Sequence, residues 1–174
     1  MQALLFILNT LLTLVVVAYL LRVLMPLVRA DFRNPIGQAV LAITNPLVLP
    51  LRKVLPPSKR LDAAAVVALL IVQFAGTALL RLVGGGGFSP GSILIGGLYE
   101  LVQTILQFYF VAILIYALLS WVASGSYNPA HQILSRLCEP LLAPVRRVIP
   151  PLGGLDLSAL FVLIALQAVQ ILLR

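Results

Sequence analysis

The sequence predicts an all-α membrane protein in which four transmembrane helices form two tandem parallel repeats. Three observations predict it: an apolar composition, four long apolar segments and an internal repeat. Hydrophobic residues make up 61% and charged residues 10% of the 174 residues, and the mean hydropathy is +1.11. A soluble domain carries about 25% charged residues. The chain therefore has too few charges to cover a water-facing surface, which excludes a soluble globular domain and a disordered chain.

Four segments are apolar over a length that can cross a bilayer. A transmembrane helix needs about 20 predominantly apolar residues. The candidate spans are residues 4–25, 63–83, 98–123 and 155–173. The first is too long, and its start too poor in basic residues, for a cleaved signal peptide, so we expect it to be retained.

The loops between these spans differ in charge. The loops 26–62 and 124–154 hold most of the Lys and Arg residues, whereas residues 84–97 carry no charge. Cytoplasmic loops of membrane proteins collect Lys and Arg, so we expect both basic loops in the cytoplasm and both termini in the periplasm. Anionic lipid headgroups account for the net charge of +7. No direct binding of nucleic acid is expected.

The two halves of the chain match without a gap at an offset of 94 residues. Residues 34–73 and 128–167 share 15 identical positions out of 40, several of them prolines. We therefore divide the chain into a first repeat, 1–87, and a second repeat, 88–174. Each repeat contains two spans, so both copies enter the membrane from the same side.

Each basic loop contains an apolar segment punctuated by proline. Asn34 and Asn128 are candidate helix N-caps because Pro35 and Pro129 follow them at the first helical position. The later prolines are expected to interrupt or kink each helix; they are Pro46, Pro50, Pro140 and Pro144. We expect short amphipathic helices that lie in the membrane interface, and a re-entrant path stays open.

Charged residues recur around these helices. The basic pairs Arg52-Lys53 and Arg146-Arg147 are candidate binding residues for lipid phosphates or for a partner. Asp62 and Asp156 each follow the arginine by ten residues and precede a span. Each aspartate is expected to cap that span, and each could also bind the loop arginine.

Several polar residues fall inside the spans, where polar groups are costly. Gln73 and Gln167 occupy matching positions, and Glu100, Gln103 and Gln107 share one face of the third span. Hydrogen bonding between helices is the plainer interpretation, and contact with a ligand or ion is the alternative. Arg81 and Glu100 are expected to approach each other near the outer boundary.

We find no pattern typical of an enzyme. The sequence has no phosphate-binding loop, no dinucleotide fingerprint and no nucleophile elbow. His131 is the one histidine and is expected in a loop, and Cys138 is the one cysteine and is expected to pack in an apolar segment. One histidine and one cysteine cannot form a zinc site. We therefore expect neither catalysis nor a cofactor.

Residues 139–158, which read EPLLAPVRRVIPPLGGLDLS, resemble the signature of the YggT family, also called YlmG in some lineages. Ser120-Trp121 is similar to the family's end-of-span pattern, and the first repeat is a looser copy. The resemblance implies a protein of the bacterial inner membrane or of plastid thylakoids. Plastid relatives are linked to haem attachment in cytochrome b6f assembly and to nucleoid distribution, and bacterial relatives to cell-division loci and osmotic tolerance. It implies no catalytic residue.

The first hypothesis is a non-enzymatic inner-membrane scaffold or assembly factor. Its duplicated basic loops would bind anionic lipid or another membrane or membrane-associated protein, and a homo-oligomer stays open. The alternative is a small oligomeric channel or transporter linked to the response to osmotic stress, and the intramembrane Gln and Glu residues favour it.

Overall fold

The computed structural model describes residues 2–55, 61–87, 89–122, 129–148 and 157–173. Within these ranges the chain forms six α-helices and no strand, so the all-α prediction is confirmed there. The helices are α1 (Gln2–Leu27), α2 (Pro35–Arg52), α3 (Ala63–Val83), α4 (Pro90–Val122), α5 (Pro129–Val148) and α6 (Leu157–Leu172).

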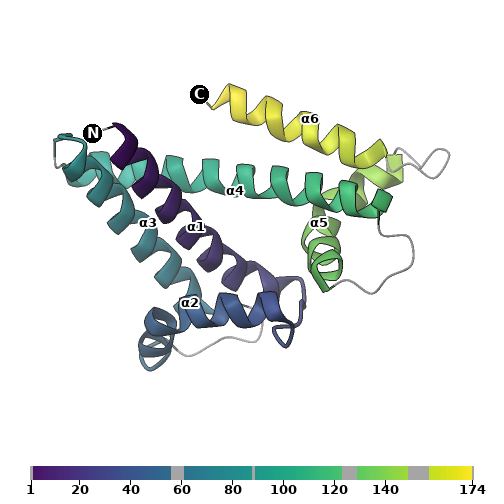
Figure 1. The fold of residues 1–174 in the computed structure, drawn as a ribbon, viewed down its shortest axis with the longest axis horizontal. Coiled ribbons are helices and arrows are strands. Elements are labelled where there is room, and N and C mark those ends of the chain that lie inside the picture. The colour runs from purple at the N-terminus through teal and green to yellow at the C-terminus, as the bar shows by residue number, and fades with distance from the viewer. Residues whose placement is uncertain (1, 56–60, 88, 123–128, 149–156, 174) are drawn as a thin grey trace.

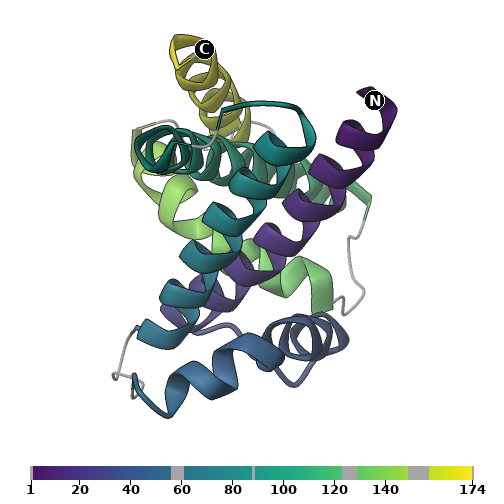
Figure 2. The ribbon, with the colours of Figure 1, turned by 90° about the vertical axis from the view of Figure 1, so that its left-hand side faces the viewer.

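The helices are arranged around two junctions (Figure 1). Helices α1 and α3 pack side by side, and α2 lies across the ends where α1 stops and α3 begins (Figures 1 and 2). Helix α4 starts beside the end of α3 and runs to α5 and α6, which pack against it. Helix α4 therefore joins the first three helices to the last two.

Three helices are long and apolar enough to cross a membrane. Among the described residues these are α1, α3 and α4, with 26, 21 and 33 residues. Helix α6 is apolar but has 16 residues, which is short of the about 20 that a span needs. Three of the four predicted spans are thus supported by length and composition, and the fourth stays a prediction.

Helix α4 begins at Pro90, earlier than the predicted start at residue 98. The prediction that residues 84–97 form a loop is wrong from Pro90 onward, because the helix starts there. Proline suits a first helical position, and the carbonyl of Ser89 accepts hydrogen bonds from the Ile93 amide at 3.0 Å and the Ser92 hydroxyl at 2.9 Å. Gly91, Gly96 and Gly97 lie within the helix, whereas the glycine run 84–87 precedes it.

The helices α2 and α5 continue through their internal prolines. Pro46 and Pro50 lie inside α2, and Pro140 and Pro144 lie inside α5, so of the two expected effects, interruption or kinking, interruption does not occur. The ribbon of α2 changes direction along its length when the two views are compared (Figures 1 and 2). A proline removes one backbone donor and crowds the preceding turn, which bends a helix without ending it.

Buried positions recur at the offset seen in the sequence. The starts of α2 and α5, Pro35 and Pro129, are 94 residues apart, as are the starts of α3 and α6. One buried cluster consists of Ala112, Ile113, Cys138, Leu142, Ala159 and Val162. Subtracting 94 from each number gives Ala18, Tyr19, Thr44, Val48, Ala65 and Ala68, and all six are buried. Both halves therefore use the same positions for packing.

Candidate functional site

The start of α2 is built by local hydrogen bonds. The Asn34 side chain accepts from the Gly37 amide at 2.8 Å, and Pro35 follows it as the first helical residue. A Cβ at Gly37 would lie 2.6 Å from Phe32 Cα, so the connection from α1 can pass only over a glycine. Asn128, the matching residue, lies outside the described residues.

Asp62 connects α2 to α3. Its side chain accepts from the Ala65 amide at 3.4 Å at the start of α3, and it forms an ion pair with Arg52 at the end of α2. The Asp62 side chain is buried. A carboxylate bonded in this way holds the end of α2 against the start of α3.

A second arginine is buried beside this ion pair. Arg22 of α1 is only 4% exposed, and its guanidinium carbon lies 5.4 Å from the centroid of the Phe32 ring. Such stacking over an aromatic face stabilises a cation that has left water. The first half therefore gathers two arginines around one carboxylate.

Arg146 at the end of α5 contacts residues of α4 and α5. Its Nη1 donates to Glu139 at 3.0 Å and its Nη2 donates to the Tyr116 hydroxyl at 3.1 Å. The ring of Tyr116 also stacks on His131, with centroids 5.4 Å apart. His131 lies in the first turn of α5, so the prediction of a loop residue is wrong. Asp156, the predicted partner, lies outside the described residues.

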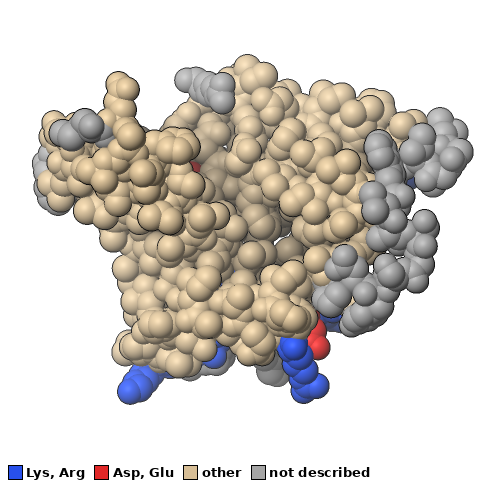
Figure 3. All heavy atoms as spheres, viewed as in Figure 1, with Lys and Arg blue, Asp and Glu red and all other residues tan. Residues whose placement is uncertain are grey.

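The second cation of each basic pair is exposed. Lys53 and Arg147 are exposed, whereas Arg52 and Arg146 are half-buried. Each is followed by an exposed valine, Val54 at 78% and Val148 at 80%. Figure 3 shows Lys and Arg side chains along the lower edge of the molecule, around α2.

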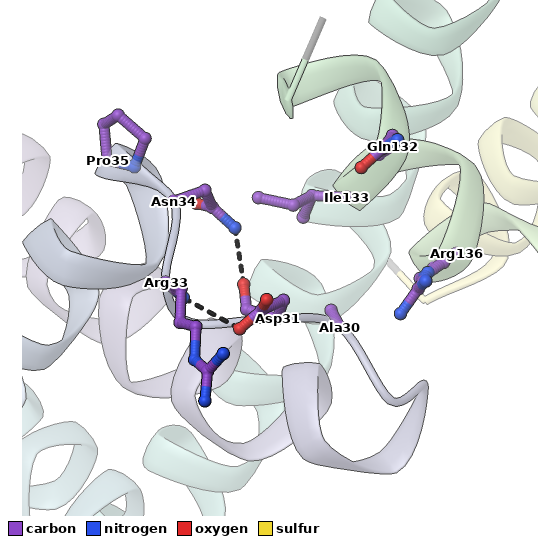
Figure 4. A pocket seen from close by; sticks show the side chains of 8 residues that line it. All are labelled: Ala30, Asp31, Arg33, Asn34, Pro35, Gln132, Ile133 and Arg136. Carbon is purple, nitrogen blue, oxygen red and sulfur yellow. Dashed lines mark hydrogen bonds between the residues drawn. The ribbon is translucent and has the colours of Figure 1, made fainter. Parts of the chain in front are cut away.

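A polar cavity of about 260 Å³ lies between the α1–α2 connection and α5 (Figure 4). Asn34 and Ile133 face each other across it, and Arg33 and Arg136 stand on opposite sides. Arg136 also donates to the backbone carbonyl of Arg29. This contact ties the second half of the chain to the first.

A second polar cavity, of about 190 Å³, lies within the long helices α1, α3 and α4. Glu100 lines it, and its Oε2 accepts from Gln73 Nε2 at 3.2 Å and from the Thr77 hydroxyl at 2.5 Å. The other polar residues that line it are Asn9, Thr13, Tyr99, Gln103 and Thr104. A carboxylate inside a span is a candidate functional group by default.

Glycines bring the helices together at this cavity. A Cβ at Gly97 would lie 2.6 Å from the Phe74 ring, so α3 and α4 can approach only where α4 has no side chain. The guanidinium of Arg81 lies over the adjacent Gly96. The pairing of Arg81 with Glu100 is wrong for the described structure, since Thr77 and Gln73 bind that carboxylate instead.

The structure separates the predicted intramembrane residues. Gln103 lines the same cavity as Glu100 and donates to the Tyr99 hydroxyl at 3.3 Å. Gln107 lines an adjacent groove together with Gln170 of α6. Gln73 is buried whereas Gln167 is exposed, so the two matching glutamines have different surroundings.

The described residues contain no group of three His, Cys, Asp or Glu side chains that could hold a metal ion. Cys138 is fully buried among apolar side chains, and burial raises the pKa of its thiol to about 12. A thiol that stays protonated is a poor nucleophile and a poor metal ligand. Cys138 therefore acts as a packing residue.

Comparison with known proteins identifies the family. The CCB3/YggT family model matches residues 1–83 and again 95–174. The chain belongs to the CCB3/YggT family. Its two matched segments each contain one copy of the proline-containing helix, α2 or α5.

Relatives in this family match nearly the whole chain. An uncharacterized protein of Pseudomonas aeruginosa is 40% identical over 98% of this chain and 87% of its own length. An uncharacterized protein of the proC 3′ region in Vibrio alginolyticus is 35% identical over 99% of this chain and 94% of its own length. The uncharacterized protein YggT of Escherichia coli K12 is 35% identical over 98% and 88%. No solved structure matches.

Several residues of this YggT-family chain escaped the sequence analysis. Thr77 donates to Glu100, Tyr116 binds Arg146, and Arg136 binds the Arg29 carbonyl. The spacing of Gln73 and Thr77, four apart on one helix face, was the available signal for the first. The other two contacts join distant parts of the chain, and no local sequence pattern predicts them.

Proposed function

We propose that this protein is a non-enzymatic scaffold whose helices α1, α3, α4 and α6 cross the bacterial inner membrane. The ends of α2 and α5 would rest on its cytoplasmic surface. The observation that carries the proposal is the exposed cation followed by an exposed valine at the end of each of these helices, Lys53-Val54 and Arg147-Val148. A valine fits the acyl boundary and a cation fits the lipid phosphates, where each contributes on the order of 1 kcal/mol.

The internal partners of the neighbouring arginines support this role. Arg52 is paired with Asp62, and Arg146 is bonded to Tyr116 of α4. These contacts hold the two helix ends at fixed positions relative to the long helices. A surface held at a fixed depth can present the same face to a second membrane protein, which is what a scaffold needs.

Crosslinking in native membranes tests the scaffold. Wild type and the double variant Lys53→Gln/Arg147→Gln would be crosslinked, extracted in mild detergent and compared by mass spectrometry. We expect specific partner proteins with wild type and their loss with the double variant. The variant Arg81→Gln, which removes a cation from the other end of α3, is the control and should keep the partners. Equal recovery from all three proteins would contradict the proposal.

A small channel or transporter is the second candidate, and the polar cavity at Glu100 favours it. A carboxylate in a span is costly to bury, so its presence there indicates a pathway or a packing contact. Under this hypothesis Glu100→Gln lowers ion flux into liposomes that contain the purified protein. Flux equal to that of wild type, or no flux in either, would count against it.

A further inference from the structure

The polar cavity between the halves carries more positive than negative charge. Arg33 and Arg136 contribute two guanidinium groups, and Asp31 contributes one carboxylate. The Asp31 carboxylate already accepts from the Arg33 backbone amide at 2.9 Å. The Arg33 side chain is exposed and makes no hydrogen bond to another described residue. Arg136 uses one nitrogen for the Arg29 carbonyl, and its other donors stay available.

A second hollow, of about 440 Å³, adjoins this cavity at Arg136. The end of α1 contributes Leu27 and Val28 to it, and α5 contributes Pro140 and Ala143. Its lining is mostly apolar. The one carboxylate there belongs to Glu139, which accepts a hydrogen bond from Arg146. The combined volume of the two hollows falls within the range of about 300–1,000 Å³ that is typical of small-ligand pockets.

The two hollows differ in chemistry in the way that the two parts of a phospholipid differ. The polar one offers planar donors suited to a phosphate group. The apolar one begins at the last turn of α1, where that long apolar helix ends. A free phosphate would occupy only the first hollow, whereas a phospholipid would occupy both.

We propose that this site binds one anionic phospholipid. Its phosphate lies between Arg33 and Arg136, and an acyl chain lies in the apolar hollow that adjoins Arg136. The lipid site rests on the proposed function in one respect, because both require the end of α1 to lie at the membrane surface. The bound lipid bridges the α1–α2 connection to α5 and so joins the two halves of the chain. Its residues differ from the exposed cations Lys53 and Arg147.

Native mass spectrometry of the detergent-purified protein tests the site. Phosphatidylglycerol and phosphatidylcholine would be added separately, and the lipid-bound fraction measured. We expect phosphatidylglycerol adducts to exceed phosphatidylcholine adducts by about tenfold or more, because only the former carries net negative charge. Arg33→Gln/Arg136→Gln should remove that excess, whereas Lys53→Gln/Arg147→Gln, with the same loss of charge, should keep it.

The matched pair of variants separates this proposal from the scaffold. Equal loss in both double variants would overturn the site and indicate diffuse attraction to the basic surface. Undiminished binding in the Arg33/Arg136 variant would overturn it as well. Neither result depends on whether partner proteins are lost from the Lys53/Arg147 variant in the crosslinking experiment. Circular dichroism and size-exclusion profiles that match wild type would show that the variants fold.

A further variant separates a lipid from a free phosphate. Ala143→Phe fills the apolar hollow and leaves every charge in place. We expect it to lower phosphatidylglycerol binding by about tenfold, while millimolar inorganic phosphate displaces little lipid from wild type. Lipid binding unaffected by Ala143→Phe, or full displacement by inorganic phosphate, would overturn the assignment to a phospholipid.

Discussion

In the first half of the molecule Arg52 is held by Asp62 at the start of α3, whereas in the second half Arg146 contacts Glu139 on its own helix and Tyr116 on α4. Tyr116 occupies the position that matches Arg22, 94 residues earlier. The first half thus buries a second cation where the second half has a phenol. The described contacts of Arg146 thus include a phenol at a position where the first half has a cation.

The apolar cores of the two halves differ much less. Thr44 and Cys138, at matching positions, are both fully buried, as are Val48 and Leu142. Apolar packing needs only side chains of suitable volume, so it tolerates a change of residue type. A hydrogen bond or ion pair needs a specific partner at a specific distance. The two halves therefore share a packing frame, while polar residues at matching positions differ in type, as Arg22 and Tyr116 do, or in burial, as Gln73 and Gln167 do.

The largest expected difference between the halves comes from their acidic residues. Asp62→Ala removes a helix cap and leaves Arg52 and the buried Arg22 without their carboxylate. We expect a loss of about 3 kcal/mol in the free energy of unfolding. Glu139→Ala breaks a more exposed pair and should cost about 1 kcal/mol or less. Titration with SDS in mixed micelles measures both, and equal losses would contradict the distinction.

The junction between the halves can be broken at one glycine. Gly97→Leu drives a side chain into the Phe74 ring, and we expect a cost of about 1–3 kcal/mol. Gly91→Leu lies on the same helix, where the nearest atom to an added Cβ is 4.0 Å away, and should be neutral. Thermal unfolding compares the two. A Gly97 variant as stable as the Gly91 variant would show that α3 and α4 do not pack as described.

The phenol of the second half supplies a smaller effect. Tyr116→Phe keeps the ring over His131 but removes the acceptor of the Arg146 hydrogen bond. We expect a loss of about 1 kcal/mol in the free energy of unfolding by SDS titration. Tyr99→Phe is the control and should change less, because Tyr99 is exposed and its hydroxyl accepts from Gln103 at 3.3 Å. A larger loss in the control would reverse the ranking.

The smallest effect at neutral pH concerns Cys138. Burial raises the pKa of its thiol from 9.0 to about 12, so folding favours the protonated form. The stability that the buried, protonated thiol contributes is fully present below about pH 9 and is lost as the pH rises toward 12. At pH 8 the folded thiol should be about 1,000-fold poorer in thiolate than the unfolded one. Alkylation by N-ethylmaleimide with and without SDS checks this, and equal rates would contradict it.

Much of the fold follows from linear patterns in the sequence. The long apolar runs predict α1 and α3 closely, because the length and hydropathy of a span are properties of one segment. Capping is equally local: Asn34 and Asp62 stand next to the helices that they cap. The start of α4 was predicted wrongly, because glycine and proline end many helices and are accommodated in others.

The candidate sites were less predictable, because their residues come from different helices. The sequence alone determined an apolar chain with segments long enough to cross a membrane and a motif that recurs at a constant offset, since both can be read along one dimension. The tertiary structure decided which polar groups meet: Glu100 with Thr77, Arg136 with the Arg29 carbonyl, and Arg146 with Tyr116. Such partners depend on how helices rotate and how closely they approach, and those quantities arise only when the helices pack against one another.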